Sequence, residues 1–79
     1  MIEKIKLIIS KISNNPQLNI TPDFSLINSG ILDSLTIIQL VNEIEDYFGI
    51  MINEEDLTIE NFTTIVQIEK LIKKYKKGN

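Results

Sequence analysis

Apolar residues recur at helical spacing in three parts of the chain. In the first part the isoleucines follow one stripe of a helix, and the lysines fall largely between them. This pattern predicts an amphipathic helix from Ile2 to about Ser13. Asn14, Asn15 and Pro16 should end it, because proline biases the residue before it away from helical angles. The predicted buried stripe is Ile2, Ile5, Ile8, Ile9 and Ile12.

A second helical pattern begins at Ser34 and continues to about Phe48. Gly49 follows it in the position of a helix-terminating residue. Leu35 and Ile37 fall off the main stripe, so we expect two exposed apolar side chains beside Ser34, available for contact with a partner. The predicted stripe is Ile38, Val41, Ile44 and Phe48, widened by Leu40 and Tyr47.

The third helical pattern lies near the C-terminus of the sequence. Thr63 or Thr64 is expected to cap this helix. The lysines in its last turns suit the negative end of the helix dipole. Its predicted core stripe is Ile65, Ile68, Leu71, Ile72 and Tyr75.

Two connections join these helices. The first is long, from about Pro16 to Asp33, and its apolar residues should hold it against the core. The second should pack residues 50–52 inward and then form a short helical turn over residues 54–57, capped by Asn53. Because no strand-like alternation is evident, the pattern predicts an all-α fold, a small four-helix bundle with a short third helix and a long first loop. The apolar residues of that loop are Leu18, Ile20, Phe24, Leu26, Ile27, Ile31 and Leu32.

Composition narrows the class of protein. The 79 residues suffice for a single domain, and 43% hydrophobic and 24% charged residues are ordinary for a globular chain. Without cysteine the chain cannot form disulfides or cysteine-rich metal sites, and without histidine its serines lack the usual general base. No apolar run reaches the roughly 18 residues of a membrane helix, and the N-terminal stretch does not resemble a signal peptide. We therefore expect a cytoplasmic protein that is no enzyme, holds no metal and does not insert stably into a membrane.

The net charge of −3 conceals an asymmetry along the chain. All eight basic residues are lysines near the two ends, whereas ten of the eleven acidic residues lie between Ile12 and Glu69, with Glu69 included. This acidic middle should repel the phosphates of nucleic acid, so a nucleic-acid partner is not expected. Basic patches on other proteins are the natural partners, although an acidic surface can also serve solubility alone.

The segment from Asn28 to Leu35 offers candidate chemistry. Gly30 suits a turn, and Asp33 has the acceptor side chain of a helix N-cap. Ser34 would then lie on the first helical turn, where unpaired N–H groups and the helix dipole favour negative charge. A phosphate on Ser34 Oγ would be well placed there. By this physics alone, a capped helix with an unmodified serine is the simpler interpretation.

Several short motifs follow one another in the middle of the chain: Gly30 to Leu35, Ile38 to Val41, Tyr47 to Ile50, Ile52 to Leu57, and Phe62 to Ile65. Together they resemble the acyl carrier protein family, over roughly Leu26 to Ile72. The resemblance implies that Ser34 carries 4′-phosphopantetheine, taken from coenzyme A, through a phosphodiester. The terminal thiol of that arm would hold an acyl or aminoacyl group as a thioester. The resemblance also implies the fold predicted above, as one carrier domain over residues 1–79.

By this resemblance the chain is a free-standing, monomeric carrier that passes its cargo between enzymes. The implied partners are a phosphopantetheinyl transferase, an acyl- or aminoacyl-activating ligase, and a downstream acyltransferase or synthase. A helical adaptor without a prosthetic group is the alternative, and a calcium loop over residues 53–56 lacks the spacing and glycine of an EF-hand. The expected docking surface is Asp33, Leu35, Thr36, Ile37, Gln39, Glu43, Asp46, Glu54, Glu55 and Asp56.

Two positions depart from carriers of fatty-acid synthesis, which place acids second and fifth after the serine. Thr36 and Gln39 stand there. With glutamine at Gln39 and glycine at Gly49, the sequence more closely resembles D-alanyl carriers of teichoic-acid modification, or stand-alone carriers of secondary-metabolite clusters. We therefore expect a small acyl or aminoacyl cargo that stays at the surface.

Overall fold

A computed structural model describes residues 1–16 and 18–76 of the chain. This part of the chain contains helices and turns but no strand, so the all-α prediction is confirmed. The expected short third helix is present as two 3₁₀ turns. In chain order the elements are α1 (Ile2–Ile12), α2 (Ser34–Phe48), η1 (Glu54–Asp56), η2 (Ile59–Phe62) and α3 (Ile65–Lys76).

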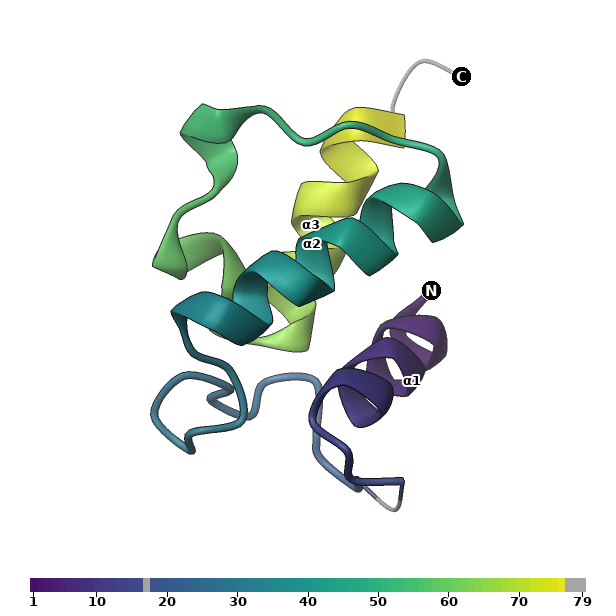
Figure 1. The fold of residues 1–79 in the computed structure, drawn as a ribbon. Coiled ribbons are helices and arrows are strands. Elements are labelled where there is room, and N and C mark those ends of the chain that lie inside the picture. Colours follow the sequence, from purple (N-terminus) through teal and green to yellow (C-terminus); the bar gives the residue numbers. More distant parts are fainter. Residues whose placement is uncertain (17, 77–79) are drawn as a thin grey trace.

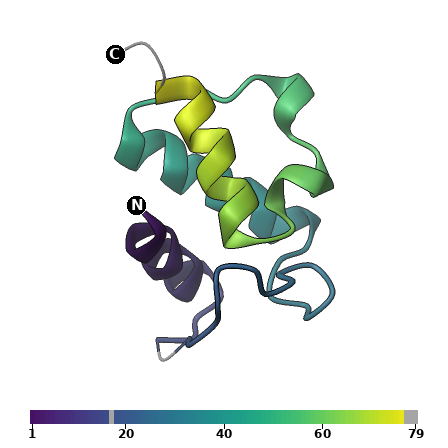
Figure 2. The same ribbon diagram turned by 180° about the vertical axis from the view of Figure 1, so that it is seen from behind.

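The three α-helices surround one core. Figure 1 shows α2 crossing in front of α3, with α1 to one side, and Figure 2 shows the same crossing from behind. Helix α1 packs against both α2 and α3. The long first loop lies at the end of the bundle where α2 and α3 begin. It is attached to the start of α3, because the Leu26 N–H donates to the Thr63 carbonyl at 2.8 Å and the Val66 N–H donates to the Pro22 carbonyl at 3.1 Å.

The predicted stripes of α1 and α3 are confirmed. Their central residues are buried, while Ile2, Ile12 and Tyr75 pack against the edge of the core. Thr64, rather than Thr63, caps α3, since its hydroxyl oxygen accepts a hydrogen bond from the Gln67 N–H at 3.1 Å. The last turn of α3 carries lysines as expected, with Lys77 outside the described residues. The core consists of Ile5, Ile8, Ile9, Leu26, Leu32, Leu40, Val41, Ile44, Ile52, Phe62, Ile65, Ile68, Leu71 and Ile72.

The buried face of α2 differs from the prediction at Ile37, Ile38 and Tyr47. Ile38 is 60% exposed, whereas Ile37 packs against the core. Ile37 lies one turn before Val41, at the centre of the face that α2 turns inward, and Ile38 lies about 100° away from it. The expectation that Ile37 is exposed was therefore wrong, and Leu35, at 66% exposure, is the exposed apolar neighbour of Ser34. Tyr47, placed on the predicted stripe, is also exposed.

The connections also differ from the prediction in part. Ile52 is buried and Ile50 packs partly inward, but Met51 is 78% exposed. Exposure therefore alternates along residues 50–52, with Met51 facing solvent between two neighbours that pack inward. Asn53 precedes η1 without a capping hydrogen bond from its side chain. In the first loop Phe24, which was expected to pack against the core, is 39% exposed. Its N–H donates to the Thr21 carbonyl and closes a turn.

Candidate functional site

The start of α2 is built by a reciprocal pair of hydrogen bonds between Asp33 and Thr36. The Asp33 carboxylate accepts the Thr36 N–H at 2.9 Å, and the Thr36 hydroxyl oxygen accepts the Asp33 N–H at 2.7 Å. This arrangement is a capping box, and it confirms Asp33 as the N-cap. Hydrogen bonds from the Thr36 N–H and hydroxyl lower the pKa of the Asp33 carboxyl. It was not predicted from the sequence that Thr36 would complete the capping box with Asp33, although a spacing of three residues is usual for this motif.

Ser34 is the first residue of α2 and is exposed. The Asp33 carboxylate already lies at the positive end of the helix, where it accepts a backbone N–H. A phosphate on Ser34 would therefore stand beside this carboxylate and share the field of the helix end with it. An exposed hydroxyl on a fixed helical turn leaves space outward for a long covalent arm.

An apolar groove of about 380 Å³ runs from Ser34 between α2 and the segment that follows η1. On one side its wall includes Ile38 of α2, and on the other Leu57 and Ile59. These three side chains are between 43% and 60% exposed, so the groove is an apolar surface open to solvent beside the serine. The sequence did not predict this groove, because Ile38 was placed in the core and residues 58–61 were not assigned to an element.

The structure divides the expected docking residues into two groups. Leu35, Gln39, Asp46, Glu54 and Glu55 are exposed on α2 and η1. The others already have contacts within the molecule. Asp33 and Thr36 form the capping box, and Ile37 packs against the edge of the core. Glu43 pairs with Lys11 at 2.9 Å, and Asp56 pairs with Lys74 at 2.8 Å.

The edge of α2 that faces α1 carries little unpaired negative charge. Lys11 neutralises Glu43 there, and the Lys4 ammonium lies 3.9 Å from the centre of the Tyr47 ring. The edge near η1 instead presents the exposed Glu54, Glu55 and nearby Glu60. A basic surface that approaches Ser34 should therefore be attracted more strongly to the η1 side than to the α1 side.

Residues 3–72 match the model of a protein family described as "phosphopantetheine attachment site". The chain belongs to this family. It is a carrier protein of the acyl carrier type, and its cofactor is covalently attached 4′-phosphopantetheine. The family resemblance read from the sequence is thereby confirmed. No solved structure matched the chain.

An exposed serine hydroxyl at a helix start fits the covalent attachment that defines this family. Carrier domains of this kind are generally not catalytic, and they act by interacting with modifying and biosynthetic enzymes. Within residues 1–16 and 18–76, no helix has the length and apolar character needed to cross a membrane. The same part of the chain contains no cluster of three or more acidic, histidine or cysteine side chains that could hold a metal ion.

Proposed function

We propose that this carrier is a free-standing, monomeric and cytoplasmic single domain, residues 1–79, with Ser34 Oγ as the attachment site. The observation that carries the assignment is the placement of the serines. Only Ser29 and Ser34 are exposed among the serines of the described residues. The Ser29 hydroxyl donates to the Leu26 carbonyl at 3.2 Å within a turn, whereas Ser34 stands at the start of α2 and borders the apolar groove.

In this proposal the chain is a substrate and not an enzyme. A phosphopantetheinyl transferase joins the arm to Ser34 Oγ through a phosphodiester, and the arm's thiol then holds the cargo as a thioester. The chain contributes a fixed helix start and an exposed surface, while its flexible arm raises the local concentration of the cargo at a docked enzyme. A loading ligase and a downstream acyltransferase or synthase complete the set of proposed partners. The alternative considered above, a helical adaptor without a prosthetic group, does not account for the covalent cofactor of the family.

The attachment site is tested by intact mass. With coenzyme A and a phosphopantetheinyl transferase, the unmutated chain should gain one phosphopantetheine and Ser34→Ala should gain none. Ser29→Ala is the matched control, because it removes the other exposed serine hydroxyl and should leave the mass gain intact. A mass gain in Ser34→Ala, or none in the unmutated chain, contradicts the assignment.

We further propose that the cargo is a small acyl or aminoacyl group. Thr36 is occupied in the capping box and Glu43 is neutralised by Lys11, so α2 lacks the unpaired acids near Ser34 that fatty-acid carriers offer. The apolar groove favours a second candidate, an apolar acyl chain, since its three exposed side chains would lose contact with water when covered.

Amide chemical shifts distinguish the two cargoes. The carrier is loaded with a short aminoacyl group or with a medium-length fatty acyl group, and the spectra are compared. For a surface cargo we expect neither group to shift the buried residues Ile44, Ile65 and Ile68. Shifts of those residues with the fatty acyl group alone contradict the preference for a small cargo.

A further inference from the structure

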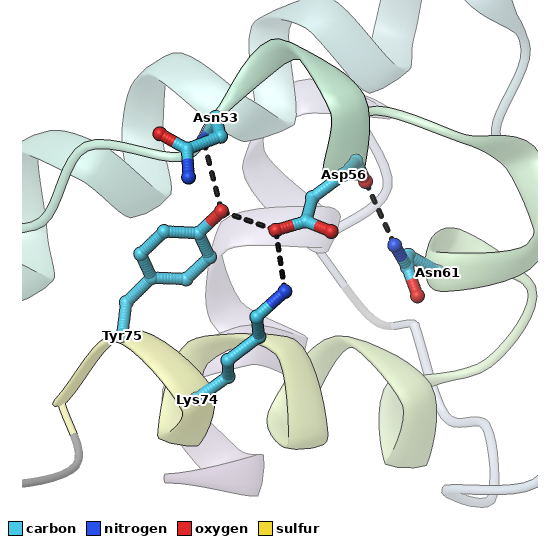
Figure 3. A network of polar contacts seen from close by, with 5 residues as sticks. All are labelled: Asn53, Asp56, Asn61, Lys74 and Tyr75. Carbon is cyan, nitrogen blue, oxygen red and sulfur yellow. Dashed lines mark hydrogen bonds and ion pairs between the residues drawn. The ribbon is translucent and has the colours of Figure 1, made fainter.

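The end of α3 reaches the segment around η1 through one tyrosine. The Tyr75 hydroxyl accepts a hydrogen bond from the Asn53 N–H at 2.9 Å and donates one to the Asp56 carboxylate (Figure 3). Lys74 donates to the same carboxylate at 2.8 Å, and the Asn61 side-chain amide donates to the Asp56 carbonyl at 2.8 Å. Because Asn53 precedes η1 and Asp56 ends it, a single hydroxyl binds both ends of this turn.

Buried side chains hold this stretch of chain only at its two ends. Ile52 and Phe62 are buried, but no side chain between them is. Leu57 and Ile59, which form the groove wall opposite α2, therefore depend on the position of the backbone that carries them. That backbone continues directly from Asp56 to Leu57, so the contacts to Tyr75 are the anchor nearest to Leu57. Ile59 lies in η2, which also contacts α3 and ends at the buried Phe62.

Tyr75 and Lys74 are not equivalent in this network. The Lys74 side chain is 60% exposed, so solvent and ions screen its end of the ion pair, although the Asp56 side chain is only 15% exposed. The Tyr75 ring packs against the core, so its hydroxyl is held in a fixed place. Because the ring is already held in place, the hydrogen bonds of its hydroxyl cost little conformational entropy. One of them is made to the charged Asp56 carboxylate, and hydrogen bonds to charged acceptors are stronger than those between neutral groups.

We propose that Tyr75 is a positioning residue, which acts through Asn53 and Asp56 to fix the groove wall that an approaching phosphopantetheinyl transferase meets beside Ser34. This inference rests on the proposed attachment at Ser34. It assigns to α3, on the other side of the turn, a part in presenting that serine. The adjacent Glu54 and Glu55, both exposed, would be held in register with the wall by the same contacts.

Amide hydrogen exchange tests the positioning step without any partner. Tyr75→Phe keeps the packed ring and removes the hydroxyl, and Tyr47→Phe is the matched control, since the described contacts of Tyr47 use only its ring. We expect roughly tenfold faster exchange in Tyr75→Phe at the N–H groups of Asp56 and Leu57, which bond within the turn. Amides of α1 should be unchanged, and Lys74→Met should have the smaller effect. Equal exchange in the two tyrosine variants overturns the proposal.

Kinetics of modification test the consequence for the serine. In Tyr75→Phe the KM for the carrier should rise severalfold while kcat stays the same, because the capped start of α2 is untouched. Tyr47→Phe should match the unmutated chain in both constants. Equal KM values in the two variants overturn the proposal even if exchange differs. If the unmutated chain is not modified at all, the assignment of Ser34 fails, and the exchange comparison still decides whether Tyr75 positions the wall.

Discussion

Thr36 stabilises the start of α2, at a position that carriers of fatty-acid synthesis use for recognition of their partners. Carriers of fatty-acid synthesis place an acid at this position after the serine. Here the Thr36 hydroxyl accepts the Asp33 N–H and completes the capping box. The side chain therefore supports the helix start that carries Ser34 and leaves no charge there for a partner.

The cap gives a prediction for stability. Asp33→Ala should lower the melting temperature by about 4–8 °C, the effect of losing one N-cap in a domain of this size. Asp46→Ala is the matched control, because it removes an equal charge from an exposed position on the same helix. Thermal melting followed by circular dichroism measures both. Equal losses in the two variants would show that charge, and not capping, matters at Asp33.

At the scale of elements, the helices could be predicted because their signals are local. Apolar spacing and the terminating Gly49 were enough to place α1 and α2 within a residue of their observed ends. Ile37 and Ile38 were confused because either neighbour fits a helical stripe that passes through Val41, and only the direction of the core decides between them. The hydrogen bond between Tyr75 and Asp56 joins residues that are far apart in the sequence, so no local sequence pattern could predict it. The groove depends on that contact and on the exposed Ile38, and it could not be predicted either.

The end of α2 gives a second prediction. Gly49 adopts φ of +66°, and a side chain added there would meet no atom within 4 Å. Gly49→Ala should therefore destabilise the fold through backbone strain alone, by about 1–2 kcal/mol. Gly49→Asn should cost less, because asparagine tolerates this conformation. Chemical denaturation measures both variants, and an equal loss for alanine and asparagine would contradict the strain argument.

At the scale of the whole molecule, the uneven distribution of charge along the sequence gives rise to ion pairs between different elements. Lysines from the two ends of the chain reach acids of its middle, as Lys11 does with Glu43 and Lys74 with Asp56. The acids that remain exposed lie mainly around η1 and the outer face of α2. Folding thus concentrates the negative surface on the side of the groove.

These links predict how stability depends on pH. Hydrogen bonds from Lys74 and then Tyr75 lower the pKa of Asp56 below its ordinary 3.8. A lowered pKa stabilises the folded state at pH values above 3.8, and this contribution is lost as the pH falls through the lowered value. The hydrogen bond to Asp56 raises the pKa of Lys74 above 10.5, so its charge is retained throughout the acid range.

Asp56→Asn isolates this contribution. The variant should be less stable than the unmutated chain at neutral pH, and the difference in melting temperature should shrink as the pH falls below 3.8. Asp46→Asn serves as the control for a general change of charge. A difference between Asp56→Asn and the unmutated chain that stays constant through the acid range would contradict the assignment to Asp56.

The bonds from the first loop to the start of α3 also bear on the order in which the chain folds. Leu26 bonds to Thr63 and Pro22 to Val66, and each pair is far apart in the sequence. Helices α1 and α2 can begin to form from neighbouring residues, but these bonds must wait until a long stretch of chain has closed. We therefore expect the loop that leads into Asp33 and Ser34 to become ordered late, together with the docking of α3. A nascent or damaged chain in which α3 has not docked can therefore contain Ser34 and helix α2 without the ordered loop that leads into them in the folded carrier.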